Sequence, residues 1–219
     1  MAESGDALSA SDIQAAITLE GPADLPDPQS LRVGCLDLGL KRDHSGFCLL
    51  EARPGAGRVK LLLAKKWAPG IGGRVDLIGL QSDILDIHRR FRMNILEYDP
   101  WNAGAIAQNF QQAGLRTCEV PFTPANVDAM ARVLIEAFRE QRIDLFDDED
   151  LIRGLHKLSI QERAWGYRLT APRDGHGHED VAISFSIGLP MAWEIANSPP
   201  VDPYTAGLAS GRISEYVYA

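Results

Sequence analysis

Three aspartates at the ends of apolar segments could together hold divalent cations. Asp37 closes the run LRVGCLD, Asp99 closes the run NILEYD, and Asp180 opens the run DVAISFSIG. A buried carboxylate is unfavourable without a partner, and clustered carboxylates repel one another unless a cation neutralises them. Oxygen ligands with room for water suit Mg²⁺ or Mn²⁺. Two such ions, about 3.5–4 Å apart, can activate a water molecule and stabilise the leaving oxygen of a phosphodiester.

Each aspartate taken alone has a simpler explanation. Asp37 could begin a turn before Gly39, Asp99-Pro100 is a common turn, and Asp180 could be an ordinary acid at a helix start. Taken together they favour one shared site, because all three adjoin strongly apolar elements in an order that one fold explains.

The elements that must position these residues follow from the hydrophobic pattern. Three apolar runs joined by short Gly/Pro turns predict an antiparallel meander, and later segments alternate between helical and strand periodicity. Pro190 is expected to kink or break the last helix, which is apolar nearly all round and so buried. We expect strands over 31–39, 46–53, 58–68, 93–98 and 115–122, and a strand or hairpin over 163–171. Helices are expected over 77–91, from the N-cap Asn102 to Gly114, after the N-cap Thr123, over about 148–157, and over 179–196.

These elements predict a mixed α/β sheet, an antiparallel three-strand meander plus parallel strands, flanked by helices. The first strand and the strand over 93–98 can lie side by side. Their carboxyl ends would then place Asp37 and Asp99 at one edge, where open α/β sheets gather their ligands. A helix that begins at the same edge would add Asp180.

Composition sets the wider limits. The chain has 219 residues and a net charge of −8, and none of its apolar stretches approaches the length of a membrane span. Its three cysteines show no paired spacing, which favours reduced thiols in a cytoplasmic protein. Residues 1–30 carry six acids and no Lys or Arg, and residues 144–150 carry five more acids; without these, 19 acids face 22 basic residues. We expect a flexible acidic linker or arm over residues 1–29, one domain over 30–197, and a tail over 198–219.

Three segments together resemble a known family. The Asp37-x-Gly39 element, YDPWNA after a strand, and GHEDVAISFSIG at the start of a buried helix resemble the nuclease domain of phage large terminase subunits, an RNase H-like domain. The resemblance runs from about Leu31 to Ala196. It implies a metal-dependent endonuclease that cuts concatemeric viral double-stranded DNA during genome packaging, with little sequence specificity. The implied partners are double-stranded DNA, the terminase ATPase motor domain, the portal and the small terminase subunit, in the host cell cytoplasm and without a membrane.

The resemblance also assigns roles to residues. Asp37, Asp99 and Asp180 would be the catalytic, metal-binding triad for two divalent cations, Mg²⁺ or Mn²⁺, with Asp37 bridging the ions. Asp43 and Glu179 match positions of supporting acids, and His178 could contact a metal or the scissile phosphate. The basic residues that flank the predicted edge are candidates for DNA phosphate contacts. They are Lys41, Arg42, Arg74 and Arg173, whereas Lys65, Lys66 and the Arg89, Arg90 and Arg92 cluster are interpreted as strand-end and helix-end charges.

The sequence departs from a full large terminase in one respect. It contains no GxxxxGK[ST] motif, so the phosphate-binding loop of the packaging ATPase is absent from it. We therefore expect an isolated nuclease domain, with residues 1–29 corresponding to the linker that follows the motor.

Other readings of the same residues stay open. A RuvC-like Holliday-junction resolvase of the same fold would act as a dimer and cleave symmetrically. An actin-like nucleotide-binding protein shares the Asp-x-Gly element, although the segment after Asp37 offers no loop for phosphate. A catalytically silent DNA- or partner-binding module is the third, and clustered acids argue against it.

Overall fold

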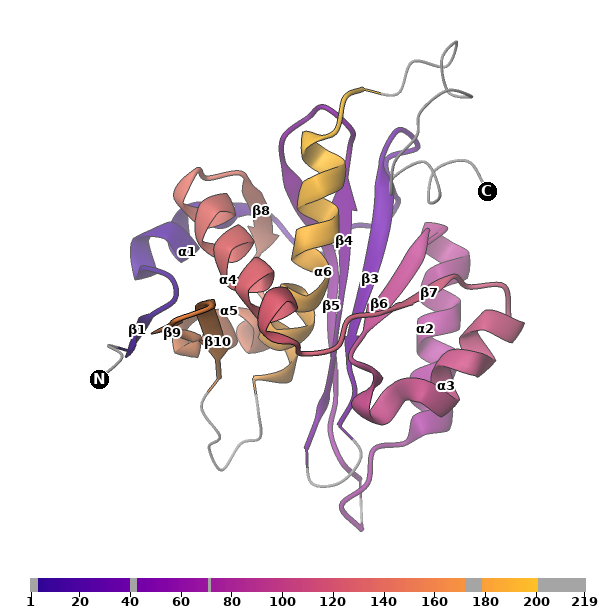
Figure 1. The fold of residues 1–219 in the computed structure, drawn as a ribbon. Helices are drawn as coiled ribbons and strands as arrows, with labels where there is room; N and C mark the ends of the chain where they lie inside the picture. Colours follow the sequence, from indigo (N-terminus) through magenta and orange to yellow (C-terminus); the bar gives the residue numbers. More distant parts are fainter. Residues whose placement is uncertain (1–3, 40–42, 71, 172–178, 201–219) are drawn as a thin grey trace.

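A seven-stranded mixed sheet forms the centre of the protein (Figure 1). This computed structural model describes residues 4–39, 43–70, 72–171 and 179–200. The strands β3 (Leu31–Asp37), β4 (Ser45–Ala52) and β5 (Val59–Trp67) form an antiparallel meander. The predicted meander is therefore confirmed.

Short parallel strands extend the meander on both sides, in the order β2-β8-β5-β4-β3-β6-β7. The strand β6 runs parallel to β3, and β8 runs parallel to β5. Among the described strands of this sheet, β4 alone therefore runs in the opposite direction. The additional strands are β2 (Ile17–Leu19), β6 (Ile95–Tyr98), β7 (Thr117–Glu119) and β8 (Ile143–Phe146).

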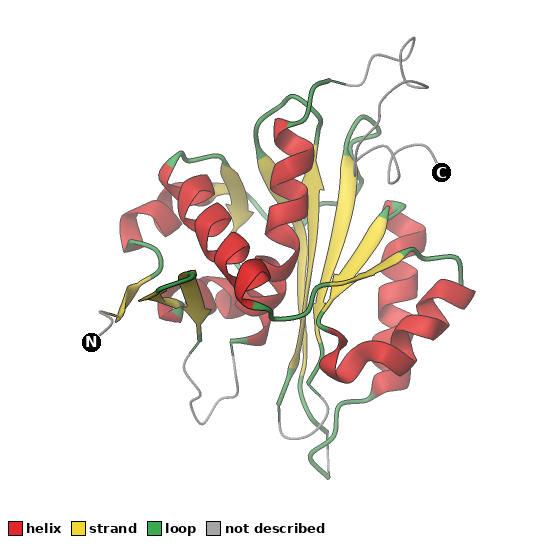
Figure 2. Ribbon diagram, viewed as in Figure 1, coloured by secondary structure: helices red, strands yellow, loops and turns green. Residues whose placement is uncertain are grey.

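Helices cover both faces of the sheet (Figure 2). One face packs against α2 (Leu77–Phe91) and α3 (Pro100–Gln112). The other packs against α6 (Asp180–Asn197), behind which lie α4 (Pro124–Arg139), α5 (Glu149–Lys157) and α1 (Ala10–Ala16). The RNase H-like mixed sheet flanked by helices is confirmed.

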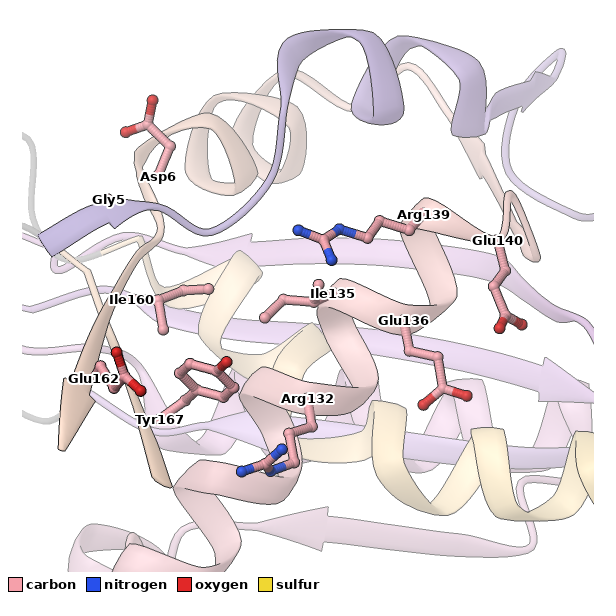
Figure 3. A pocket seen from close by; sticks show the side chains of 10 residues that line it. All are labelled: Gly5, Asp6, Arg132, Ile135, Glu136, Arg139, Glu140, Ile160, Glu162 and Tyr167. Atoms are coloured by element: carbon pink, nitrogen blue, oxygen red, sulfur yellow. The ribbon is translucent and has the colours of Figure 1, made fainter. Parts of the chain in front are cut away.

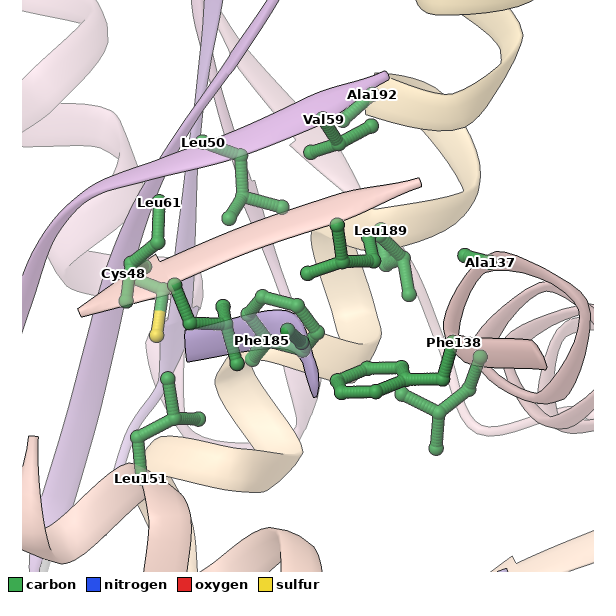
Figure 4. Packing of buried hydrophobic residues seen from close by; sticks show 14 of the residues in the cluster. Cys48, Leu50, Val59, Leu61, Ala137, Phe138, Leu151, Phe185, Leu189 and Ala192 are labelled. Atoms are coloured by element: carbon green, nitrogen blue, oxygen red, sulfur yellow. The ribbon is translucent and has the colours of Figure 1, made fainter. Parts of the chain in front are cut away.

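Alternation along β4 divides the apolar interior into two layers. Phe47 and Leu49 face the layer beneath α2 and α3, whereas Cys48 and Leu50 face α6. On the α6 side, Phe138 and Phe185 meet edge to face, with 6.4 Å between their ring centroids (Figure 4). The helix α6 continues through Pro190 as far as Asn197, so the break predicted there does not occur. Within the described ranges, none of the helices combines the length and apolar character that crossing a membrane would need.

A second, three-stranded sheet lies against α4. It contains β1 (Ser4–Asp6), β9 (Ser159–Arg163) and β10 (Gly166–Thr170), in the order β1-β9-β10. The strands β9 and β10 form the hairpin predicted near residues 163–171. Residues of this sheet and of α4 together line a pocket of about 640 Å³ (Figure 3).

The flexible arm expected over residues 1–29 is wrong for residues 4–19. In the structure β1 pairs with β9, β2 pairs with β8, and α1 buries Ile13 and Ala16 in the main core. The acids in this segment hid the pattern, because Asp12 lies in the first turn of α1 while Ile13 beside it faces inward. The acidic run 144–150 contributes to the core as well, since Leu145 and Phe146 of β8 are buried within it.

Candidate active site at the carboxyl edge of the sheet

Strand register places Asp37 beside Asp99. In the parallel ladder between β3 and β6, Leu36 pairs with Tyr98, so the next residue of each strand is an aspartate at the same edge. Neighbouring strands lie about 4.8 Å apart. Asp99 is also the N-cap residue of α3, with Pro100 at the first helical position. The N-cap predicted at Asn102 is therefore wrong, because the helix begins directly at the end of the strand.

A glycine brings Asp180 to the same edge. On its other side, Asp37 pairs with Gly46 of β4. A Cβ atom on Gly46 would lie 2.2 Å from the backbone carbonyl oxygen of Asp180, so only glycine lets the first turn of α6 approach β4 this closely. The predicted meeting of the three aspartates at one edge follows from this approach together with the β3–β6 register.

Hydrogen bonds join Gly39, which follows β3, to Ser45, which begins β4. The backbone N–H of Gly39 donates to Ser45 Oγ at 3.2 Å, and this hydroxyl lies 3.1 Å from the Gly39 carbonyl oxygen, to which it can donate. A Cβ atom on Gly39 would lie 2.1 Å from the His44 carbonyl oxygen. Asp43, just before His44, lines the same pocket as Asp37 and Asp180.

The carboxylates influence one another strongly. Burial raises the pKa of Asp37 to about 7, and the nearby Asp99 and Asp43 add to the rise. Burial also raises the pKa of Asp180 to about 8, with Asp37 and Asp43 adding to it and Lys66 opposing it. The pKa of Asp99 is raised by burial, which the backbone N–H of Trp101 partly offsets. At neutral pH Asp37 and Asp180 therefore resist carrying their full negative charge without a cation.

One oxygen of this cluster has no protein partner. Asp180 is 4% exposed, and within the described part of the chain its Oδ2 atom is buried without a hydrogen bond. Buried polar atoms are nearly always satisfied, so an unsatisfied carboxylate oxygen facing other carboxylates fits a cation. Within the described ranges, no three His, Cys, Asp or Glu side chains lie close enough together to hold a metal ion between them. The carboxylates of Asp37, Asp43 and Asp180 are nevertheless the hard oxygen donors that Mg²⁺ prefers, and they line one pocket.

A pocket of about 410 Å³ is lined by Asp37, Asp43 and Asp180, whereas Asp99 is not among its lining residues. Beside Asp37, Asp43 and Asp180, its lining includes Phe122 and Arg168, which the sequence reading did not select. Phe122 had a detectable signal, since it follows a third strand that ends at the same edge. Arg168 had none, because its strand belongs to the second sheet and reaches the pocket only through packing on α4.

The other predicted residues lie elsewhere. Glu179 is 5% exposed, and its Oε1 accepts from Lys157 Nζ at 2.6 Å, so this carboxylate is neutralised next to the pocket and does not line it. Arg74 is exposed in the loop before α2, and it is not among the lining residues. The candidates Lys41, Arg42, Arg173 and His178 lie outside the described residues.

Lys66, interpreted from the sequence as an ordinary strand-end charge, belongs to the surroundings of the site. Its Nζ lies 3.0 Å from Asp150 Oδ1, and its charge lowers the pKa of Asp180. It therefore supplies positive charge to the acid cluster, and its ion pair with Asp150 joins β5 to α5.

Comparison with known proteins shows what this arrangement resembles. No protein-family model matches the sequence, and no curated protein matches it. Among solved structures, the large terminase of bacteriophage HK97 superposes with a TM-score of 0.72 at 14% identity, over 87% of this chain and 44% of that one. The large terminase nuclease of the thermophilic phage G20c gives 0.62 at 14% identity, over 81% and 94% of the two chains. The chain has the fold of large terminase nucleases.

A third terminase agrees with the first two. The large terminase nuclease domain of Thermus phage P74-26 gives a TM-score of 0.61 at 16% identity, over 87% of this chain and 98% of that one. This chain thus spans nearly the whole of two isolated terminase nuclease domains, and under half of the HK97 large terminase. Structures of the G20c terminase nuclease have also been solved with bound magnesium, cobalt and zinc.

Proposed function

We propose that this protein is a metal-dependent endonuclease that cuts double-stranded viral DNA during genome packaging. The observation that carries the proposal is the buried Asp180 carboxylate beside Asp37 at the carboxyl edge of the sheet, one oxygen of which has no hydrogen-bond partner among the described residues. The likeness in fold to terminase nucleases supports the same reading, as do the divalent ions bound in structures of the G20c nuclease.

Asp37, Asp99 and Asp180 would hold two divalent cations, Mg²⁺ or Mn²⁺, with Asp43 in support. When bound, such ions lower the pKa of a water molecule and stabilise the leaving oxygen of a phosphodiester. The protein contributes the arrangement of the ligands: β3 and β6 fix two of the acids in register, and Gly46 lets α6 deliver the third. Because carboxylates alone repel phosphate, the strand must be held by cations elsewhere around the pocket.

The larger assembly follows from the span of the chain. The protein covers 44% of the length of the HK97 large terminase. We infer that it works beside a terminase ATPase motor, with the portal and the small terminase subunit as further partners, in the host cell cytoplasm. Double-stranded DNA would be bound with little sequence preference, through phosphates rather than base edges.

Cleavage of supercoiled plasmid by the purified chain tests the proposal. We expect nicking and linearisation with Mn²⁺ or Mg²⁺ and none with EDTA. Asp37→Asn should lower the rate of cleavage at least about 100-fold, because the metal site loses one of its charged ligands. Asp86→Asn is the matched control, since Asp86 is an exposed acid that pairs with Arg89 on α2.

Calorimetry with Mn²⁺ on the same proteins separates the remaining explanations. Metal binding that Asp37→Asn weakens, and Asp86→Asn does not, supports the site even if cleavage needs the motor. Absence of both metal binding and cleavage in the unaltered chain would reject the proposal.

A further inference from the structure

The pocket that holds the acids also contains an aromatic ring and a positive charge. Phe122 and Arg168 line it together with Asp37, Asp43 and Asp180. The two residues come from segments 46 positions apart in the sequence, and neither belongs to the strands that carry the acids. Their meeting at the pocket is a property of the fold.

Arg168 is exposed and available for a ligand. Although it shares a pocket with three acids, its guanidinium group makes no ion pair or hydrogen bond with any residue that the structure describes. An arginine side chain presents a planar set of donors that matches the oxygens of a phosphate. A DNA strand entering the pocket would therefore meet an unneutralised cation beside the acids.

Phe122 offers apolar surface on a segment that is already held in place. Its side chain and backbone together are 46% exposed, which is unusual for a residue of this type. The Pro121 carbonyl oxygen accepts from Thr123 N at 2.7 Å and from Asn126 Nδ2 at 2.8 Å. Before it, Val120 N donates to the Tyr98 carbonyl oxygen at 2.8 Å. Because the backbone on both sides of Phe122 is held, the ring can contact a ligand without the loss of conformational entropy that ordering a loop would cost.

The start of α4 positions both residues. Thr123 caps this helix directly after Phe122. One turn later, Asp128 Oδ1 accepts from the backbone N–H of Tyr167 at 2.7 Å, which fixes β10 next to Arg168. The Arg132 guanidinium lies 5.0 Å from the centre of the Tyr167 ring and holds the same strand (Figure 3).

We propose that Phe122 and Arg168 position the DNA strand for cleavage. Arg168 binds a phosphate next to the one that is cut, and Phe122 packs against the sugar or base of the adjoining nucleotide. The inference rests on the proposed nuclease function and deepens it by naming contacts that hold the strand against the repulsion of the acids. Both contacts are independent of sequence, because every nucleotide presents a phosphate and an apolar face.

Binding of a fluorescent DNA duplex to the full chain tests the Arg168 contact. Ca²⁺ replaces Mg²⁺ so that the site is neutralised while cleavage is suppressed, and the affinity is measured over a series of salt concentrations. Arg168→Gln should reduce the slope of log affinity against log salt by about 1, and raise Kd roughly 5- to 10-fold at low salt. Arg168→Lys keeps the charge and should keep the slope. Arg139→Gln removes the same charge from the far end of α4 and should change neither quantity.

Phe122 needs a different comparison. Phe122→Ala should raise Kd about 5-fold without altering the salt slope, because the lost contact is not ionic. Phe122→Leu keeps apolar bulk and should lie between Phe122→Ala and the unaltered protein. Trp165→Ala, which removes an exposed aromatic ring from the turn between β9 and β10, is the control.

The outcomes are distinct. If Arg168→Gln keeps the unaltered slope and affinity, while the unaltered protein binds and cuts DNA, the inference is wrong and the nuclease proposal stands. If the unaltered protein neither binds DNA nor cuts it with Mn²⁺ or Mg²⁺, both fail.

Discussion

The carboxyl groups of the site lower the stability of the folded protein when they are ionised, and Asp180 shows this effect. Burial and the charges of Asp37 and Asp43 raise its pKa to about 8, and Asp37 rises to about 7. Both values lie above the ordinary 3.8, so folding favours the protonated carboxyls. Their contribution to the free energy of unfolding is fully present below about pH 3.8 and is lost as the pH rises through 7 to 8.

Removing the charge of Asp180 should therefore stabilise the metal-free protein at alkaline pH. We expect Asp180→Asn to raise the free energy of unfolding by about 3–4 kcal/mol more at pH 8 than at pH 5, because the charged carboxylate destabilises the folded state increasingly between these two pH values. Urea unfolding in EDTA at the two pH values measures the difference. Asp86→Asn is again the control, and an equal response of both variants at pH 8 would contradict the explanation.

At the level of elements, the site depends on how closely α6 approaches β4. Gly46 lies at the contact with β4, where a Cβ atom would stand 2.2 Å from the Asp180 carbonyl oxygen. Gly188 lies at a second contact of α6, with β3, where a Cβ atom would stand 1.9 Å from Cys35 Sγ. The first contact sets the position of a proposed metal ligand, and the second sets the depth of the helix in the core.

Gly46→Ala adds only one methyl group, yet it should displace the first turn of α6 and with it Asp180. The added methyl group must displace the first turn of α6, so we expect a loss of about 1–3 kcal/mol in stability and weaker Mn²⁺ binding. Gly104→Ala provides the control, because a Cβ atom there meets nothing within 4 Å. In the helix α3 it should stabilise by roughly 0.5–1 kcal/mol. Unaltered metal affinity in Gly46→Ala would show that the approach of α6 does not position Asp180.

Much of this arrangement is readable from the sequence, because local patterns carry it. The meander strands, the helices α2 and α4, and the acids that end β3 and β6 all stand out as apolar runs with clear boundaries. By contrast, β8 is a strand of four residues that overlaps the acidic run 144–150, and no local hydrophobic pattern predicts it. Arg168 is beyond sequence reasoning altogether, because its place depends on how the second sheet packs against α4.

At the level of the whole molecule, residues 4–19 join the two sheets. They contribute β1 to the small sheet and β2 to the edge of the large one, and between them Ile13 is buried at 1% exposure. The side chain of Thr18 donates to Asp144 Oδ1 at 2.8 Å, which adds a polar contact to the same edge. The segment is thus part of the domain and not a linker to it.

A single substitution distinguishes these two views. Ile13→Ala should lower the free energy of unfolding by about 2–4 kcal/mol, because it leaves a cavity in the main core. Leu25→Ala should change it by less than about 0.5 kcal/mol, since Leu25 is 78% exposed. Chemical denaturation measures both changes. If Ile13→Ala left the free energy of unfolding unchanged, residues 4–19 would be a loosely attached arm and not part of the domain.

The pairing of β2 with β8 also bears on the order in which the protein folds. Ile17 and Leu145 are partners across the edge of the sheet, yet more than half of the chain separates them. The meander β3–β4–β5 joins segments that are neighbours in the sequence, and closing its short loops loses little chain entropy. During synthesis, β2 leaves the ribosome early but must wait for β8. We therefore expect the sheet to grow outward from its centre, with the beginning of the chain among the last parts to dock.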